Sequence, residues 1–252
     1  MNIIIPCAGA AKRFKECGYQ DIKPFITTKG ELMIEWVLKN LVLSKINQKF
    51  IFLFQKEDIR LHDVASIIYK ISKKLDINYE IIEINGLTDG SARTTIFAES
   101  LINNNEELIL ANSDQFVSNF NIAELIGYSR GNNLDCGILT FTDTDSKWSF
   151  VRRCESSIYI DLVKEKEPIS NLANVGIFYW KNGADYVASV KSMIAKNIRV
   201  GSEFYVSPSI NELIADKKLV SNYHLNPLYG QKMWGLGTPF DHQKFESLYE
   251  AN

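Results

Sequence analysis

Short apolar runs alternate with segments of helical periodicity through the first half of the chain. The runs span residues 2–6, 50–55, 79–84 and 107–111, and apolar residues between them recur at helical spacing. Runs that are apolar throughout are typical of parallel strands buried on both faces, with helices as the crossovers. The alternation predicts an α/β fold of three layers with a mostly parallel, Rossmann-like sheet.

From about residue 131 the pattern changes to runs rich in β-branched and aromatic residues. They span residues 136–142, 149–153, 157–163 and 173–180, and polar turns separate them. This pattern predicts a smaller antiparallel extension. Helical periodicity returns at residues 185–195, 209–216 and 239–249. Because no repeat or linker-like tract separates the halves, we expect one domain, residues 1–252, with halves 1–130 and 131–252.

Charge and composition exclude several classes of partner. The chain carries 28 Lys and Arg against 30 Asp and Glu, a formal net charge of −2, without a run of like charges that would hold a polyanion. Nucleic acid and anionic membrane are therefore not expected partners. No apolar stretch approaches the roughly 18 residues that a spanning helix needs. We expect a cytoplasmic protein that acts on small molecules, and the sequence leaves a homo-oligomer open.

A loop of small residues follows the first predicted strand. Small side chains leave backbone N–H groups uncovered, so such a loop can wrap a phosphate. Arg13 and Lys23 can neutralise a triphosphate from its flanks, and ligands of open parallel sheets lie at this edge. The same residues also fit a plain strand-to-helix turn. The loop reads Ala8-Gly9-Ala10-Ala11-Lys12-Arg13-Phe14, and Lys23-Pro24 follows.

This loop resembles the signature of the sugar-phosphate nucleotidyltransferases, the family of the NDP-sugar pyrophosphorylases. Ala11 replaces the second glycine of that signature, Lys12 its serine or threonine, and Ile22 the proline before the lysine. The resemblance implies a GT-A-like nucleotidyltransferase fold in which residues 1–130 bind a nucleotide and residues 131–252 an acceptor. By resemblance, nucleotide binding falls to Ala8, Gly9, Ala10 and Lys12, and catalysis to Arg13, Lys23 and Lys166.

A second segment of the resemblance, residues 85–92, follows a predicted strand and opens a helix. In the family a glycine here passes under the nucleoside base and an earlier polar side chain contacts the base edge, and Gly90 and Asn85 take those positions. A glycine lets the backbone approach a flat ring, and a carboxamide both donates and accepts. Ser91 is placed with them in nucleotide binding, and it can also cap the helix. A pyrimidine nucleotide is expected, with CTP slightly ahead.

A candidate metal ligand, Asp114, follows the strand predicted at residues 107–111. By resemblance this aspartate holds a catalytic magnesium ion. Mg²⁺ prefers oxygen ligands and is held by one or two carboxylates together with substrate phosphates. Mg²⁺ is therefore the expected cofactor, although an aspartate at a strand end also commonly caps a helix.

A charged segment at residues 163–168 and the run after it resemble the family's acceptor site. By resemblance Glu165 would bind the hydroxyls or polar tail of the acceptor and Lys166 its phosphate. Asn174 and Gly176 would line the pocket. An extra Glu167 stands between the lysine and the proline of the family pattern. Without the resemblance, these charges also fit a solvated hairpin.

The last segment, residues 234–241, resembles the family pattern D-x-G-T-P-x-D but lacks its first aspartate. Gly235 stands where that aspartate commonly supplies a second carboxylate to magnesium. Either Asp114 and the phosphates hold the metal alone, or another carboxylate such as Asp241 reaches the site. The sequence leaves both possibilities open.

The implied reaction joins a nucleoside triphosphate to a phosphorylated small metabolite and releases pyrophosphate. A sugar 1-phosphate is the favoured acceptor, in capsule or surface-polysaccharide biosynthesis. Two alternatives stay open: a cytidylyltransferase for a phosphorylated amino acid or polyol, and a catalytically silent protein that binds nucleotide conjugates, which Gly235 favours. The G-x-S-x-G match at residues 127–131 lacks the strand–turn–helix context of a hydrolase nucleophile.

Overall fold

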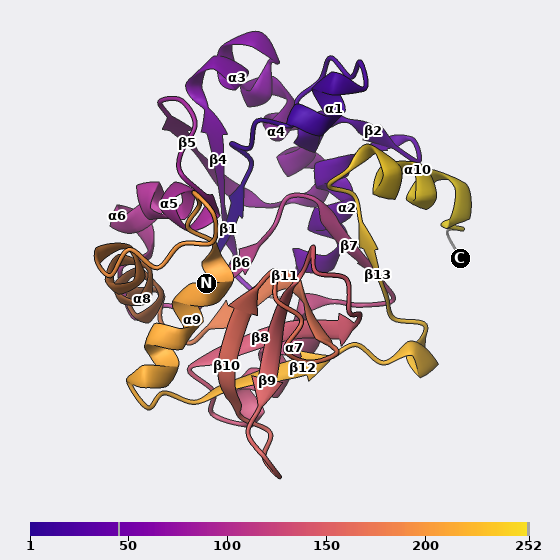
Figure 1. Cartoon of the computed structure of the whole chain (residues 1–252). Coiled ribbons are helices and arrows are strands. Elements are labelled where there is room, and N and C mark those ends of the chain that lie inside the picture. The colour runs from indigo at the N-terminus through magenta and orange to yellow at the C-terminus, as the bar shows by residue number, and fades with distance from the viewer. Residues whose placement is uncertain (45, 251–252) are drawn as a thin grey trace.

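One mixed sheet forms the centre of the molecule (Figure 1). The computed structural model describes residues 1–44 and 46–250, and within them the sheet has nine strands. Its path runs β10-β9-β11-β6-β1-β4-β5, with β8 and β12 attached beside β11. The parallel strands are β1 (Asn2–Pro6), β4 (Lys49–Gln55), β5 (Asn78–Ile84) and β6 (Leu108–Ala111). The four apolar runs are thus confirmed as parallel strands.

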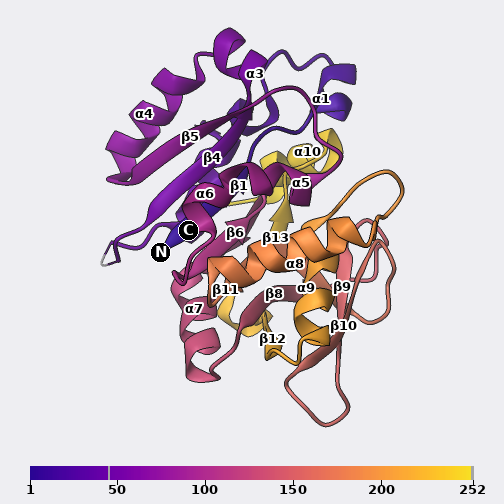
Figure 2. The same ribbon diagram turned by 90° about the vertical axis from the view of Figure 1, so that its left-hand side faces the viewer.

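Helices cover both faces of this sheet (Figure 2). Ile3 and Ile4 are both fully buried but belong to different hydrophobic clusters, because successive side chains of a strand point to opposite faces. One cluster contains residues of α2 (Met33–Leu41), α4 (Val64–Leu75) and α7 (Ile122–Gly131); the other contains residues of α5 (Ser91–Thr95), α6 (Glu99–Ile102), α8 (Gly183–Ala195) and α9 (Val206–Ala215). The predicted three layers are confirmed.

The antiparallel strands of the second half continue the same sheet. Strand β11 (Leu172–Trp180) pairs antiparallel with β6 on one side and with β8 (Cys136–Thr142) and β9 (Ser149–Arg153) on the other. Strand β10 (Ile160–Glu165) pairs antiparallel with β9. Strand β12 (Val220–His224), which the sequence pattern did not predict, pairs parallel with β8. The extension is therefore built onto the parallel strands.

A small second sheet returns the C-terminal segment to the end of β6. Strand β7 (Gln115–Ser118) pairs antiparallel with β13 (Lys232–Gly235), and Gln115 lies opposite Gly235. Helix α10 (Pro239–Leu248) follows, and its Phe245 packs with Phe14 and Trp36 in a third cluster. Both strands have four residues, too few for the alternation of side chains to stand out in the sequence.

The remaining elements are short and lie mostly in the connections. They are α1 (Lys12–Glu16), η1 (Lys23–Phe25), β2 (Thr27–Thr28), β3 (Glu31–Leu32), α3 (Lys56–Leu61), η2 (Ile96–Ala98) and η3 (Pro227–Tyr229). Among the residues described, no helix has the length and apolar character needed to cross a bilayer.

Candidate active site

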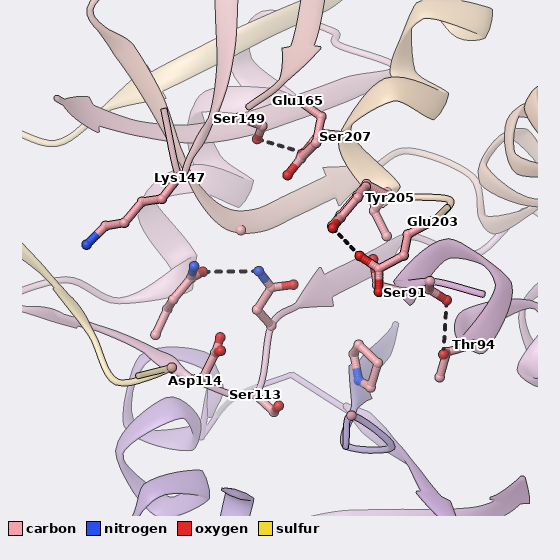
Figure 3. Close-up of a pocket in the computed structure, with 18 of the residues that line it drawn as sticks. Ser91, Thr94, Ser113, Asp114, Lys147, Ser149, Glu165, Glu203, Tyr205 and Ser207 are labelled. Carbon is pink, nitrogen blue, oxygen red and sulfur yellow. Dashed lines mark hydrogen bonds between the residues drawn. The ribbon is translucent and has the colours of Figure 1, made fainter. Parts of the chain in front are cut away.

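A cavity of about 570 Å³ opens at the carboxyl edge of the parallel strands (Figure 3). Strand β1 ends there at Pro6, and residues 112–115 follow β6 into its wall. The segment after β5, the strands β9 to β11 and the turn between β13 and α10 supply the remaining walls. Ligands of open parallel sheets bind at this edge, so both halves of the chain contribute to one site.

Most of the site residues inferred from the sequence line this cavity. They come from the loop after β1, from η1, from the segments after β5 and β6, and from β10 and β11. They are Ala8, Gly9, Ala10, Arg13, Lys23, Gly90, Ser91, Asp114, Glu165, Lys166, Asn174 and Gly176.

Two of the inferred nucleotide-binding residues, Lys12 and Asn85, lie outside the cavity lining. Lys12 begins α1, and its exposed side chain lies 3.9 Å from the Glu16 carboxylate, one helical turn away. Asn85 lines a separate hollow beside Arg60. The chain turns at residue 86, so Thr88 reaches the cavity wall instead.

The backbone of the segment before α9 passes so close to position 90 that only a glycine fits there. Its φ angle is +123°, and a Cβ atom built there would lie 2.3 Å from the Phe204 carbonyl oxygen. The Phe204 amide donates to the Asp89 carbonyl at 2.7 Å, which fixes this close approach. This contact alone accounts for a glycine at position 90.

Replacing Gly90 by Ala should lower the free energy of unfolding by about 3 kcal/mol, because the added methyl group must displace backbone atoms at a positive φ. Urea denaturation measures this change. Gly9→Ala is the matched control, because its φ is not in the left-handed region and a Cβ there meets nothing within 4 Å. Equal stability of the two variants would contradict the role assigned to the Phe204 contact.

Asp114 and Lys23 form an ion pair on the cavity wall. The Lys23 Nζ lies 2.9 Å from the Asp114 Oδ2, and each side chain is 21% exposed. A Cβ at Gly237 would lie 2.4 Å from the same Oδ2, so the glycine keeps open the space around the carboxylate. The backbone amide of Leu236 donates to the Asp114 carbonyl at 2.8 Å and holds the two segments together.

A second carboxylate, Asp241, stands beside Gly235. A Cβ at Gly235 would lie 3.7 Å from the Asp241 Cγ, and both residues line the cavity. The Thr238 hydroxyl donates to Asp241 at 2.7 Å, and the Lys147 Nζ lies 3.2 Å from its other oxygen. The structure thus places a carboxylate in the space next to the position where the family's aspartate is missing.

The other end of the cavity carries a chain of hydrogen bonds. The Lys166 Nζ donates to the Tyr205 hydroxyl at 2.5 Å, and that hydroxyl donates to Glu203. Burial raises the pKa of Glu165 to about 7; the nearby Lys166 opposes this shift and Glu203 adds to it. Figure 3 shows Glu165, Glu203 and Tyr205 on the side of the pocket away from Asp114.

Uncharged polar side chains line the part of the cavity between these two ends, here called the floor. The Asn174 Oδ1 accepts from the Gly176 amide at 2.7 Å, and its Nδ2 donates to the Ser207 Oγ at 3.2 Å. The Ser207 Oγ also lies 2.8 Å from the Ser149 Oγ. Gly176 has a φ of +87°, and a Cβ there would lie 2.2 Å from the Gln115 Oε1. Asn174 and Gly176 therefore shape the floor through contacts of their own.

Several lining residues were not found from the sequence because they belong to no motif. They reach the cavity from the loop before β9 and the start of β9, and from the segment before α9 and the start of α9, and only the pairing of distant segments brings them together. They are Lys147, Trp148, Ser149, Glu203, Tyr205 and Ser207.

Glu165→Gln should change the dependence of stability on pH. The folded pKa of about 7 lies above the ordinary value of 4.5, so ionisation of Glu165 opposes folding as pH rises from about 4.5 to 7. Between pH 4.5 and pH 8, the free energy of unfolding of the variant should therefore rise by roughly 2 to 3 kcal/mol relative to that of the wild type. Urea denaturation across this range measures the gain, and parallel curves for the two proteins would refute it.

The chain belongs to the nucleotidyl transferase family, whose model matches residues 2–199. No curated protein matches it in sequence. Similar solved structures include a nucleoside-diphosphate-sugar pyrophosphorylase from Vibrio cholerae RC9, with a TM-score of 0.81 and 22% identity, covering 97% of this chain and 99% of that one. A UDP-glucose pyrophosphorylase from Acinetobacter baumanii has a TM-score of 0.75 and 15% identity, covering 97% of this chain and 91% of that one. A UDP-glucose pyrophosphorylase complexed with UDP-glucose has a TM-score of 0.77 and 13% identity, covering 98% of this chain and 97% of that one. The protein is a nucleotidyltransferase with the fold of these enzymes.

Enzymes of this family generally use a divalent metal ion, and the cavity is suited to one. Within residues 1–44 and 46–250, no three His, Cys, Asp or Glu side chains gather as a complete metal site. A magnesium-type ion needs only one or two carboxylates when substrate phosphates supply the other ligands. Asp114, with the open space beside Gly237, meets that requirement.

Proposed function

We propose that this nucleotidyltransferase condenses a pyrimidine nucleoside triphosphate, with CTP favoured, with a phosphorylated small metabolite. A sugar 1-phosphate is the favoured class of acceptor, and capsule or surface-polysaccharide biosynthesis the favoured role. One observation carries the proposal: a single cavity lined by Arg13 holds the Lys23–Asp114 pair at one end and Glu165 and Lys166 at the other. Cations and a carboxylate beside a loop of small residues suit a metal-bound triphosphate, and the opposite end leaves room for a second substrate.

The nucleophile in this proposal is an oxygen of the acceptor's own phosphate. It forms a bond to the α-phosphorus while the bond between that phosphorus and the oxygen bridging to the β-phosphate breaks, and pyrophosphate leaves with the electron pair. Because the attacking oxygen is already ionised at neutral pH, no general base is needed. Catalysis then consists of alignment and of charge neutralisation on the leaving group.

Arg13 and Lys23 would neutralise the triphosphate, and Lys166 would hold the acceptor phosphate in line. A magnesium ion held by Asp114, with Asp241 as a second carboxylate within the same cavity, would supply further neutralisation. Lys23 pairs with Asp114 in the protein without ligands. Binding of a metal-bound triphosphate would therefore exchange this ion pair for contacts of Lys23 with phosphate and of Asp114 with the metal.

Pyrophosphate release with magnesium tests the proposal. CTP, UTP, dTTP, GTP and ATP are each combined with a panel of sugar 1-phosphates and phosphorylated amines, and release should require one triphosphate and one acceptor together. Silence across the panel with tight nucleotide binding would instead support a catalytically silent binder. Cytoplasmic location, a single domain and a homo-oligomeric state remain proposals from the sequence.

A further inference from the structure

The acceptor end of the cavity, formed by Glu165, Lys166, Glu203 and Tyr205, carries carboxylates without cationic partners. Among residues 1–44 and 46–250, neither Glu165 nor Glu203 has a Lys, Arg or His nitrogen within 4.0 Å. At the other end Asp114 and Asp241 each have a lysine at 3.2 Å or less. The two ends therefore differ: one is paired internally, and the other has unmatched negative charge.

The nearby cation is already engaged by a neutral group. The Lys166 Nζ donates to the Tyr205 hydroxyl at 2.5 Å and lies over the Tyr205 ring, 4.4 Å from its centroid. Lys166 is the cation proposed to hold the acceptor phosphate, and Arg13 lies near enough to lower the pKa of the Tyr205 hydroxyl. The Glu165 and Glu203 carboxylates therefore lack a direct cationic partner that is not already engaged.

The neutral groups beside these carboxylates have few hydrogen bonds left for ligand hydroxyls. Ser149 and Ser207 bond to each other, and Asn174 bonds to Ser207 and to the Gly176 amide. Within the described residues the Glu165 side chain accepts no hydrogen bond, and the Glu203 side chain accepts only that of Tyr205. The hydrogen-bond acceptor atoms still free at this end are therefore mostly carboxylate oxygens, which form their strongest hydrogen bonds with a charged donor.

We propose that the acceptor carries a primary ammonium group, which Glu165 and Glu203 bind. The inference rests on the proposed function and narrows its acceptor to phosphate monoesters that bear an amine. Two sources share this chemistry: amino sugar 1-phosphates and phosphorylated amino alcohols or amino acids. In both probes used below, two carbon atoms separate the amine from the phosphate oxygen, and the experiment distinguishes the two sources.

The ionisation of Glu165 supports this assignment. Burial raises its pKa to about 7, Glu203 raises it further, and Lys166 lowers it. Burial, and then the neighbouring Glu203 and Glu165 carboxylates, raise the pKa of the Tyr205 hydroxyl, while Arg13 lowers it. A bound ammonium group favours the ionised carboxylate. Binding at pH 7 should therefore release up to about half a proton from Glu165.

Matched acceptor pairs test the proposal. The initial rate of pyrophosphate release is compared for glucosamine 1-phosphate against glucose 1-phosphate, and for phosphoethanolamine against 2-hydroxyethyl phosphate. We expect the amine of at least one pair to have a kcat/KM at least tenfold above that of its neutral partner. Preference in the first pair identifies an amino sugar, and preference in the second an amino alcohol.

Two variants separate recognition of the amine from a structural role. Glu165→Gln and Glu203→Gln should each reduce the amine preference to within about threefold, whereas a change that only distorts the site would lower the rates with both members and keep the preference. Calorimetry of phosphoethanolamine binding in two buffers of different ionisation enthalpy should show proton release by the wild type that Glu165→Gln loses.

The outcomes distinguish failure of the inference from failure of the proposed function. Equal rates within both pairs, or a preference for the neutral members, would overturn the inference and leave the proposed function intact. If no acceptor yields pyrophosphate, the proposed function fails. Calorimetry then still decides the inference: tighter binding of phosphoethanolamine than of 2-hydroxyethyl phosphate would uphold it, and equal binding would overturn it.

Discussion

Asp114→Ala is expected to lower kcat by about 1,000-fold or more, because it removes the carboxylate proposed to hold the catalytic metal. The loss should come without unfolding, since among residues 1–44 and 46–250 the Asp114 side chain pairs only with Lys23, and the backbone contact to Leu236 is kept. Pyrophosphate release with saturating substrates measures the loss, and circular dichroism checks the fold.

Nucleotide binding without metal gives this variant a second readout. In the wild type Lys23 is held by Asp114 at 2.9 Å. Removing the carboxylate frees the lysine and takes a negative charge away from the triphosphate, so metal-free CTP should bind Asp114→Ala at least as tightly as it binds the wild type. Weaker metal-free binding together with slow turnover would indicate general damage to the site and would count against a metal role for Asp114.

Lys23→Ala is expected to lower kcat by roughly 100- to 1,000-fold, the scale of losing one donor that stabilises charge in the transition state. Lys23 follows the loop of small residues, and η1 holds it at the cavity wall through buried Pro24 and Phe25. The loss should appear mainly in kcat, because the charge on the pyrophosphate grows as it leaves.

Lys15→Ala is the matched control for this variant. Lys15 is also a cation in the N-terminal segment, but it is exposed on α1 and does not line the cavity. Its removal should leave kcat within about twofold of the wild type. Near-normal turnover of Lys23→Ala would remove that lysine from the catalytic machinery, and an equal loss in both variants would indicate that only long-range charge matters.

The parallel part of the fold was predictable because its strands are buried on both faces. Residues 2–6 match β1 to the residue, since a continuous apolar run leaves little ambiguity about its ends. In the antiparallel extension, residues 136–142 match β8 equally well. Strands β7, β12 and β13 were missed. They are four or five residues long and mix polar with apolar side chains, and distant pairing decides that they form.

The residues that line the candidate site were predictable where their placement depends on local sequence. The loop at residues 8–13 and the aspartate after β6 lie at strand ends, and the order of strands brings these ends together. Lys12 and Asn85 could not be placed, because a rotation of about 100° per helical residue or a single turn at Gly86 decides which way a side chain points. Glu203 and Tyr205 reach the cavity wall because residues 203–207 pack against β9 and β11. No local sequence pattern indicates that packing.

The pairing of β7 with β13 has a consequence for the order in which the protein becomes active. Gly235 and Gly237 flank Asp114 although they lie more than a hundred positions later in the chain. During synthesis the loop after β1 and the strands around it are made first, but the pocket that surrounds Asp114 closes only after β13 has left the ribosome. A nascent chain therefore lacks the complete wall around Asp114 until residues 232–237 have folded back onto β7.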